Sequence, residues 1–371
     1  MTTIILLLIF CYIIGAFLNV DVGKAAYMSP PELPSPIYIR SDGSVEPQSG
    51  IQKIGDTYNF TRDINNYIEV QRDNIIIEGN GFSITQTPID TSGSMTPLGF
   101  YPGIRLNNRN NVTVQNVKIH NCISGITFNS AKNITITNNI ITSISEIAIF
   151  GSSSNNCTIT QNNITNNHSG IGIQVISTTG VLIAENNIKR NSEGIRISGS
   201  GYPSNYITIT RNNISDNTRW GVYIYQGSEN SVVGNNIRNN PIGLLVKFAN
   251  VTVHHNNFDN TQNVDNTSCV GPWDDGSKGN YWSDYNGTDK DNDGIGDTAY
   301  IVETLRIWIE PSTQTPVTIG VNAQDNYPLI YTVDINSVVI PEFSSWTILP
   351  LVLSATLIAV VLKKRLAKTS I

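Results

Sequence analysis

Charged side chains are scarce in this chain of 371 residues. Asp, Glu, Lys and Arg together make up 14% of the sequence, the formal net charge is -6 and the sequence pI is about 5.2. Proteins that bind nucleic acid present clustered basic residues to the phosphate backbone, and the sequence contains no basic stripe of that kind. The composition therefore argues against nucleic acid as a partner.

Soft metal ligands are few as well. The chain has three methionines, four cysteines and four histidines, and they are scattered along the sequence. Two of the histidines, His254 and His255, are adjacent, and neighbours on a strand point to opposite faces, so they are not expected to share one metal. Copper prefers clustered thioether, thiolate or imidazole ligands, and the sequence predicts no such cluster.

What the chain does contain is a repeat. An asparagine pair followed by an apolar residue recurs every 21 to 26 residues, a period typical of stacked coils. The pairs are Asn138-Asn139, Asn162-Asn163, Asn186-Asn187, Asn212-Asn213, Asn235-Asn236 and Asn256-Asn257. Stacked amides can hydrogen-bond along a coil stack, and we expect the first asparagine of each pair to point inward.

Short alternating segments precede the asparagine pairs, as in Ile134-Thr135-Ile136 and Ile207-Thr208-Ile209. Alternation of aliphatic residues and threonine is typical of a half-buried strand, and β-branched residues and asparagine are poor helix formers. The sequence thus predicts an all-β fold, a parallel β-helix (solenoid) with one coil per repeat. Cys122 and Cys157 then lie on different coils, too far apart for a disulfide, as small buried residues.

The remaining segments suggest an exported protein with a C-terminal anchor. An apolar run from Ile4 to Leu18 resembles a secretory signal, with an uncleaved anchor as the alternative. A second run from Trp346 to Leu362 precedes three basic residues, as expected for a membrane span with a cytoplasmic stop. The predicted organisation is a signal peptide (1–26), a Pro-rich linker (27–36), an N-terminal cap (37–72), parallel coils (73–260), an aromatic and Asp-rich module (261–331), a second linker (332–345) and a transmembrane anchor (346–365).

One segment of the Asp-rich module is similar to the first part of an EF-hand loop. Oxygen ligands for Ca²⁺ recur at alternate positions, with a glycine at the sixth; the candidates are Asp289, Asp291, Asp293, Ile295 through its carbonyl, and Asp297. Tyr300 stands where the bidentate glutamate is usual. Asp284, Glu303 or Asp325 would have to complete the shell. We expect a structural calcium ion, with a solvated acidic turn as the alternative.

Acidic residues are too sparse in the coils to predict a catalytic constellation. Arg190, Arg196 and Asp216 are the weak catalytic candidates, with Arg190 and Asp216 expected to form an ion pair. A ligand-binding surface is better supported, because rings with polar neighbours suit sugars. Its candidates are Arg196, Arg219, Trp220, Tyr223, Tyr225 and Lys247. The first file of outward residues is expected to contain Arg105, Thr127, Ala148, Gly172, Arg196, Tyr223 and Leu245, and the second Asn107, Asn129, Gln174, Ser198, Tyr225 and Lys247.

Three segments carry a family resemblance: Ile39 to Val45, Gly279 to Tyr285 and Asp325 to Leu329. With the repeats, they resemble archaeal surface proteins of the NosD-like right-handed β-helix family. The resemblance implies the pectate-lyase-like superfold and a carbohydrate-binding or sugar-hydrolase-type domain. The copper role described for NosD is not carried over, since the soft ligands are absent. Pro341-Glu342-Phe343 resembles an archaeal sorting signal at which the anchor could be exchanged.

Three functions follow as hypotheses. The first is a non-catalytic, membrane-anchored surface protein that binds glycans or builds the cell envelope. The second is a lyase, hydrolase or epimerase acting on an acidic or neutral polysaccharide. The third, least favoured, is an accessory protein for copper delivery.

Overall fold

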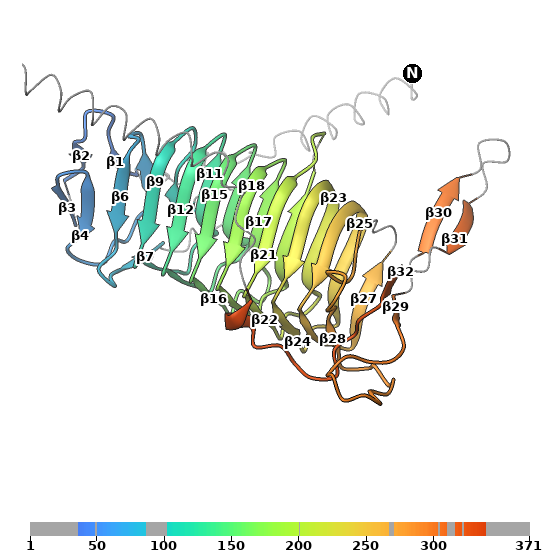
Figure 1. The fold of residues 1–371 in the computed structure, drawn as a ribbon. Helices are drawn as coiled ribbons and strands as arrows, with labels where there is room; N and C mark the ends of the chain where they lie inside the picture. The colour runs from blue at the N-terminus through green and yellow to red at the C-terminus, as the bar shows by residue number, and fades with distance from the viewer. Residues whose placement is uncertain are drawn as a thin grey trace, which may run out of the picture. The chain divides into compact units, whose positions relative to one another are not determined.

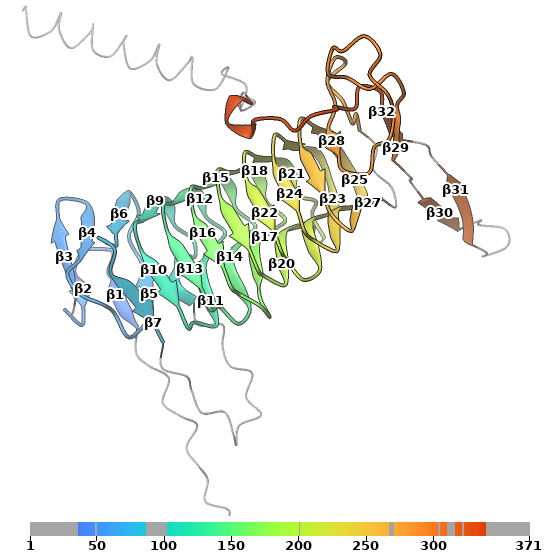
Figure 2. The ribbon, with the colours of Figure 1, turned by 90° about the horizontal axis from the view of Figure 1, so that it is seen from below.

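The computed structural model describes residues 36–48, 50–86, 102–199, 201–266, 271–302, 305–309, 316–320 and 323–338. Nearly all of the regular structure in these residues is β-strand, and the strands recur three to a repeat. They lie side by side along a stack of coils (Figure 1), which Figure 2 shows from below. The predicted all-β parallel solenoid is confirmed.

Each coil contributes one strand to each of three parallel stacks. The first stack contains β1 (Ile37–Ile39), β5 (Ile68–Val70), β8 (Pro102–Arg105), β11 (Ser124–Asn129), β14 (Ile147–Ser152), β17 (Ile171–Ile176), β20 (Glu193–Ser198), the first parts of β23 (Trp220–Val233) and β25 (Ile242–His254), and β27 (Gln262–Asn266). The second contains β4 (Thr57–Phe60), β6 (Ile75–Glu78), β9 (Asn110–Gln115), β12 (Lys132–Thr137), β15 (Asn155–Thr160), β18 (Thr179–Ala184), β21 (Asn205–Thr210) and the later parts of β23 and β25. The third contains β7 (Ser83–Thr85), β10 (Lys118–His120), β13 (Ile140–Thr142), β16 (Asn163–Thr165), β19 (Asn187–Lys189), β22 (Asn213–Ser215), β24 (Asn236–Arg238), β26 (Asn257–Asp259) and β28 (Tyr281–Trp282).

A few elements lie outside these stacks. Strand β2 (Val45–Glu46) pairs antiparallel with β1, and β3 (Ile51–Ile54) pairs antiparallel with β4. Two antiparallel pairs follow the coils: β29 (Tyr300–Val302) with β32 (Ala323–Asp325), and β30 (Leu305–Ile309) with β31 (Pro316–Gly320). A short 3₁₀ helix, η1 (Ile335–Ser337), begins after Asp334, whose side chain accepts the Asn336 N–H.

The core runs through the middle of the coils, and the alternating pattern explains it. In β12, Ile134 and Ile136 are buried, while Thr135 and Thr137 are partly exposed. Parallel register then stacks aliphatic residues on aliphatic residues, since Ile136 pairs with Val114 in the coil before and with Ile159 in the coil after. Burial of each such side chain contributes about 1.5–3 kcal/mol. The aliphatic files therefore supply one continuous core.

A file of buried asparagines runs along the bend before the third stack. In each step the backbone N–H and the side-chain amide donate to the Oδ1 atom of the asparagine one coil later; both distances from Asn162 to Asn186 are 3.0 Å. This first ladder contains Asn139, Asn162, Asn186, Asn212, Asn235, Asn256 and Asn280. The prediction that the first asparagine of each pair faces inward is confirmed from Asn162 onward. It is wrong for Asn138-Asn139, where Asn138 occupies the bend itself.

A second ladder, which the sequence analysis missed, follows the third stack. It contains Asn167, Asn191, Asn217, Asn240, Asn260 and Asn263. Most of these residues recur with the same period as the asparagine pairs, but as single asparagines they attract less notice in the sequence. Both ladders satisfy buried amides that would otherwise cost about 1–3 kcal/mol each.

Both ladders end on an aspartate. Asp325 accepts the backbone N–H of Asn280 at 2.7 Å, and Asp284 accepts the side-chain amide of Asn263 at 2.8 Å. Because every amide in a ladder donates in the same direction, the last one presents its N–H end without a further asparagine to receive it. A carboxylate suits that position for the reason that it suits the N-terminus of a helix, where aligned N–H groups carry partial positive charge.

The tryptophan next to this ladder end is held from several sides. Trp282 donates its Nε1–H to Asp325 at 2.9 Å and stacks between Phe258 and Tyr300, with ring centroids 4.6 and 4.3 Å away. The segments Gly279 to Tyr285 and Asp325 to Leu329, which carried the family resemblance, therefore meet here. Trp282 of the first segment packs between two rings, and Asp325 of the second segment terminates the ladder.

The bend before the first ladder uses left-handed backbone angles. The residue preceding the ladder asparagine has φ of 55° at Asn138, 57° at Gln161, 58° at Glu185 and 57° at His255. A left-handed residue ends the alternation of a strand, so the side chain after it does not simply switch faces. The expectation that His254 and His255 point to opposite faces is wrong for this reason: their Nδ1 atoms lie 2.7 Å apart.

Parallel pairing extends beyond residues 73–260 at both ends, from the β1–β5 pair to β27 and β28. Residues 199 and 201–204 lie between β20 and β21 outside any strand. The predicted signal (1–26) and anchor (346–365) also lie outside those ranges. Within the described residues, no helix has the length and apolarity needed to cross a membrane.

The two cysteines of the coils are unpaired and buried, as expected for Cys122 and Cys157. Burial raises the pKa of the Cys122 thiol to about 12 and that of Cys157 to about 11. Neither thiol is therefore prepared for nucleophilic chemistry at neutral pH.

Candidate functional site

Four aromatic side chains form a continuous strip on the outer face of β23 and β25. Trp220, Tyr223 and Tyr225 come from β23 and Phe248 from β25. Successive ring centroids are 4.9, 6.3 and 5.9 Å apart. Phe248 is 63% exposed, and the other three rings are partly exposed. We call this set the aromatic strip.

Two arginines lie against the strip. The Arg196 guanidinium is 5.8 Å from the centre of the Trp220 ring and 5.7 Å from that of Tyr223, and the Arg219 guanidinium is 4.2 Å from the centre of Trp220. Cation–π contacts of this kind contribute roughly 0.5–1 kcal/mol at exposed sites and more when desolvated. They also hold planar donor groups beside the exposed rings.

A buried glutamate fixes both arginines. Glu193 is 1% exposed and accepts from Arg196 through two bonds of 2.7 and 2.5 Å, and from Arg219 at 3.1 Å. A carboxylate at that depth is tolerated because two cations and their N–H groups replace the lost water. The result is a pair of guanidinium groups held beside the aromatic strip, on side chains that remain 26% and 55% exposed.

Strand register explains how residues from different coils meet here. Glu193 pairs with Trp220, Arg196 pairs with Tyr223, and Ser198 pairs with Tyr225. One coil further, Tyr223 pairs with Leu245 and Tyr225 with Lys247. The predicted ligand-binding residues thus lie on one surface that spans three successive coils, at β20, β23 and β25; they are Arg196, Arg219, Trp220, Tyr223, Tyr225 and Lys247.

Sequence reasoning missed Glu193 and Phe248 as members of this surface. Glu193 stands in a register file with Ile171 before it and Trp220 after it, so an acid in an otherwise apolar file was the available signal. Phe248 follows Lys247 at a bend, with φ of 55°, and its exposure depends on that bend.

Two predicted outward files are wrong in the middle coils. The first file contains Phe150 and Gln174 where Ala148 and Gly172 were expected, because Thr127 pairs with Phe150 and Phe150 with Gln174. Ala148 is fully buried. Gln174 therefore leaves the second file, in which Ile176 pairs with Ser198. Gly172 faces the neighbouring backbone instead, where an added Cβ would lie 2.6 Å from the carbonyl oxygen of Gly194.

The weak catalytic candidates do not form one group. Arg190 and Asp216 occupy equivalent left-handed bends after β19 and β22, but the Asp216 carboxylate pairs with Lys189 at 3.2 Å. Within the described residues, no hydrogen bond or ion pair joins Asp216 to Arg190 or Arg196. Although partial burial opposes it, bonds from Lys189, Ser215 and Asn239 lower the pKa of Asp216. A lowered pKa makes this carboxylate a poor general acid.

The acidic loop brings three of its predicted ligands together. One carboxylate oxygen from each of Asp289, Asp291 and Asp293 lies within 4.8 Å of the others. Asp289 accepts the Gly294 N–H at 3.0 Å, and Gly294 has φ of 86°, which suits the sharp turn of such a loop. The donor set and the turn fit a hard cation such as Ca²⁺.

Other predicted ligands of the loop are engaged elsewhere. Asp297 accepts from the Thr288 hydroxyl at 2.8 Å and from the Lys290 N–H at 3.2 Å. Backbone bonds from Gly296 to Pro328 and from Ile330 to Gly294 hold the chain on either side of Ile295. Asp284 and Asp325 terminate the asparagine ladders, and Glu303 lies outside the described residues. Asp325 could therefore complete the calcium shell only by giving up the hydrogen bonds that end the first ladder.

Comparison with known proteins supports the fold. The model of a family described as "Right handed beta helix region" matches residues 102–258. No curated protein matches the sequence. The chain is a right-handed parallel β-helix in its described coils, which confirms the handedness implied by the family resemblance.

Several solved structures share this architecture at low sequence identity. A mutant of the periplasmic alginate epimerase AlgG is 13% identical, covers 63% of this chain and 71% of its own, and has a TM-score of 0.47. The A-module of the mannuronan C-5 epimerase AlgE4 of Azotobacter vinelandii is 16% identical over 58% of this chain and 70% of its own, with a TM-score of 0.44. PfbA, a surface adhesin of Streptococcus pneumoniae, is 13% identical over 71% of this chain and 67% of its own, with a TM-score of 0.45. These similarities assign no activity to this chain.

Proposed function

We propose that this protein binds glycans on the aromatic strip without cleaving them. The observation that carries the proposal is the placement of four neighbouring rings beside two guanidinium groups fixed by the buried Glu193. Sugar rings pack their apolar C–H faces on aromatic side chains, and their hydroxyl and carboxylate groups accept hydrogen bonds from positioned donors.

The charges of this surface favour acidic sugars. Arg196, Arg219 and Lys247 contribute three cations, against the single Glu193 carboxylate that two of them share. The Arg219 side chain remains 55% exposed and can rotate a free N–H edge toward a uronate carboxylate. Catalysis would need a proton-transfer group close to the bound sugar. Among the described residues, the only carboxylate in contact with the two arginines beside the strip is Glu193, and it forms ion pairs with both of them.

The proposal places the coils outside the cell. The apolar segment Ile4 to Leu18 supports export, and Trp346 to Leu362 with its basic stop supports a C-terminal membrane anchor that processing at Pro341-Glu342-Phe343 could replace. A tethered β-helix would then present the aromatic strip to polysaccharides of its own envelope or of its surroundings.

A calcium ion on the acidic loop is part of the same proposal. Asp289, Asp291 and Asp293 would supply carboxylate oxygens, Ile295 a carbonyl, and Asp297 a further oxygen after giving up its bond to Thr288. Its role would be structural, because the loop is bonded to residues 328–330 next to the end of the coils.

Binding can be tested by titrating the full-length chain with polyuronates and with neutral glycans of similar length. We expect saturable binding of a polyuronate, weakened about 5- to 30-fold in Trp220→Ala and Tyr223→Ala, since a lost stacking contact costs about 1–2 kcal/mol. Tyr206→Ala is the matched control, because Tyr206 is an exposed tyrosine on β21, in a different stack. Equal binding by all four proteins would contradict the proposal.

The same incubations distinguish binding from turnover. New reducing ends, unsaturated products or epimerised units that disappear in Asp216→Ala would establish the enzyme alternative and refute the non-catalytic assignment. Retention of the glycan with an unchanged chain-length distribution is the result that we expect.

A further inference from the structure

Two histidines and an aspartate meet beside the end of the coil stack. His255 takes the left-handed bend position that Asn138, Gln161 and Glu185 take in earlier coils, and this brings its ring to the side of His254. The two Nδ1 atoms are 2.7 Å apart, and the rings are nearly perpendicular at 77°. The coils do not require histidine at either position. The file of His254 contains Thr160 and Thr210 in earlier coils, and the bend of His255 is formed there by other residue types.

Asp275 completes the group from a separate turn. One nitrogen of each imidazole and one oxygen of Asp275 all lie within 4.8 Å of one another. The Oδ1 atom of Asp275 accepts from Ser277 N at 2.8 Å, Ser277 Oγ at 2.7 Å and Lys278 N at 2.8 Å. Its Oδ2 atom faces His255 Nε2 at 3.7 Å. The turn therefore orients the carboxylate toward the imidazoles before any ligand binds.

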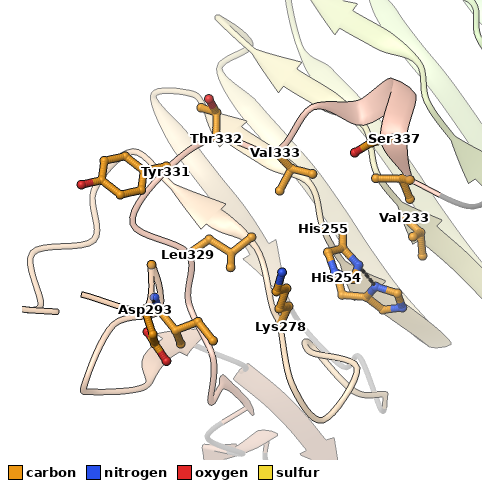
Figure 3. Close-up of a pocket in the computed structure, with 13 residues that line it drawn as sticks. Val233, His254, His255, Lys278, Asp293, Leu329, Tyr331, Thr332, Val333 and Ser337 are labelled. Atoms are coloured by element: carbon orange, nitrogen blue, oxygen red, sulfur yellow. Dashed lines mark hydrogen bonds between the residues drawn. The ribbon is translucent and has the colours of Figure 1, made fainter. Parts of the chain in front are cut away.

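The two histidines of the group line a cavity of about 540 Å³. Figure 3 shows His254 and His255 together on one wall, with the segment that carries Leu329, Tyr331 and Val333 along another. Lys278 also lines the cavity, and its ammonium group extends into it in the same view. A ligand held by the histidines would thus be accessible from a defined, partly enclosed space.

We propose that His254, His255 and Asp275 bind a divalent transition-metal ion of the zinc type. Two nitrogen ligands and one carboxylate suit Zn²⁺, whose bonds to these atoms are about 2.0–2.2 Å long and whose ligands are therefore about 3.3 Å apart in a tetrahedral site. The three candidate ligand atoms already lie within 4.8 Å of one another, and binding would require the side chains to rotate to that spacing. The fourth position faces the cavity, where Lys278 favours water or a small anion.

Neutral imidazoles and an ionised carboxylate are the forms that bind a metal, and the surroundings favour both. Burial lowers the pKa of His254 and of His255. For Asp275, partial burial is outweighed by the bonds from Ser277 and Lys278, which lower the pKa of the carboxyl to about 2. Ca²⁺ prefers oxygen ligands, so this site and the acidic loop are expected to select different ions.

The test uses replacements that other coils already contain at the equivalent positions. His254→Thr and His255→Asn restore residues found at equivalent positions, namely Thr210 and Asn138, so the variants are expected to fold. His120→Thr is the matched control, because His120 pairs with Thr85 and Thr142 in its file. Full-length chains without a polyhistidine tag would be titrated with Zn²⁺ by calorimetry, and Co²⁺ would serve as a spectroscopic probe.

We expect one Zn²⁺ per chain in the wild type and in His120→Thr. Affinity should fall at least 10-fold in His254→Thr, His255→Asn and Asp275→Asn, together with the visible absorption of nitrogen-coordinated Co²⁺, because each change removes a ligand. Asp289→Asn should leave Zn²⁺ binding unchanged. Absence of a stoichiometric site in the wild type, or unchanged affinity in both histidine variants, would overturn the proposal.

Discussion

Removing the Asp325 carboxylate should loosen the C-terminal end of the coil stack. In Asp325→Ala three donors lose their acceptor: the buried N–H of Asn280, the buried Nε1–H of Trp282 and the partly buried N–H of Tyr327. The side-chain amide of Asn280 keeps the carbonyls of Val253 and Trp273. At about 2 kcal/mol for each stranded donor, the gross cost is about 6 kcal/mol.

The charge of the carboxylate offsets part of this cost in a pH-dependent way. Burial raises the pKa of Asp325 to about 6 from 3.8, although the N–H donors of Asn280, Trp282 and Tyr327 lower it. A difference of about 2.2 pKa units corresponds to about 3 kcal/mol. Because the folded pKa is raised, this stability is fully present below about pH 4 and is lost as the pH rises through about 6. The net cost of Asp325→Ala should be about 6 kcal/mol near pH 4 and about 3 kcal/mol at pH 7.

Hydrogen exchange measured by mass spectrometry can locate the effect, because a coil stack loses stability locally. At pH 7 we expect amides of β26 and β28 to exchange on the order of 100-fold faster in Asp325→Ala, while those of β13 and β16 stay unchanged. Asp274→Ala is the matched control, since Asp274 accepts two bonds from the exposed Asn326. If β26 and β28 of Asp325→Ala exchanged as slowly as in the wild type, the idea that the carboxylate terminates the ladder would be refuted.

Two further predictions concern the interior of the ladder and the acidic loop. Asn186→Ala should lower the free energy of unfolding by about 2–4 kcal/mol in urea denaturation, because it strands buried partners on Asn162 and Asn212, whereas the half-exposed neighbour Asn187→Ala should cost less than about 1 kcal/mol; similar costs would contradict the buried role. Ca²⁺ at 100 times its Kd should stabilise the wild type by about 2.7 kcal/mol, seen as a higher melting temperature that chelator reverses, and Asp291→Asn should abolish that response; an unchanged midpoint in the wild type would count against calcium.

Periodicity was sufficient to predict the stacking, because a parallel coil forces like residues into files. Ile136 between Val114 and Ile159 follows directly from the spacing of the Ile-Thr segments. The same spacing placed Arg196 beside Tyr223 correctly. It failed at Ala148, because coil lengths differ and the expected register was two residues off: Phe150 pairs with Thr127, and Ala148 lies buried before it.

The misses at individual sites have a common physical cause. Sequence alternation assumes that a strand continues, but His255 and Phe248 adopt left-handed angles that turn their side chains out of the alternating pattern. Burial of Glu193 depends on two arginines from different coils, and such a contact is visible only once the register is known. The repeat pattern therefore could not predict ion pairs between coils or the bends at which a strand stops alternating.

In a solenoid, chemistry is best sought where a file departs from its own repeat. The asparagine and aspartate residues that dominate the sequence are largely engaged in ladders and their ends, so their abundance marks structure. Glu193 and Trp220 interrupt a file that has isoleucine on both sides, and His254 interrupts one of threonine and small aliphatic residues. Neither interruption improves the core or the ladders. Because the coil would stack as well with the residues of its neighbours, these departures are the positions on which the proposed glycan and zinc sites rest.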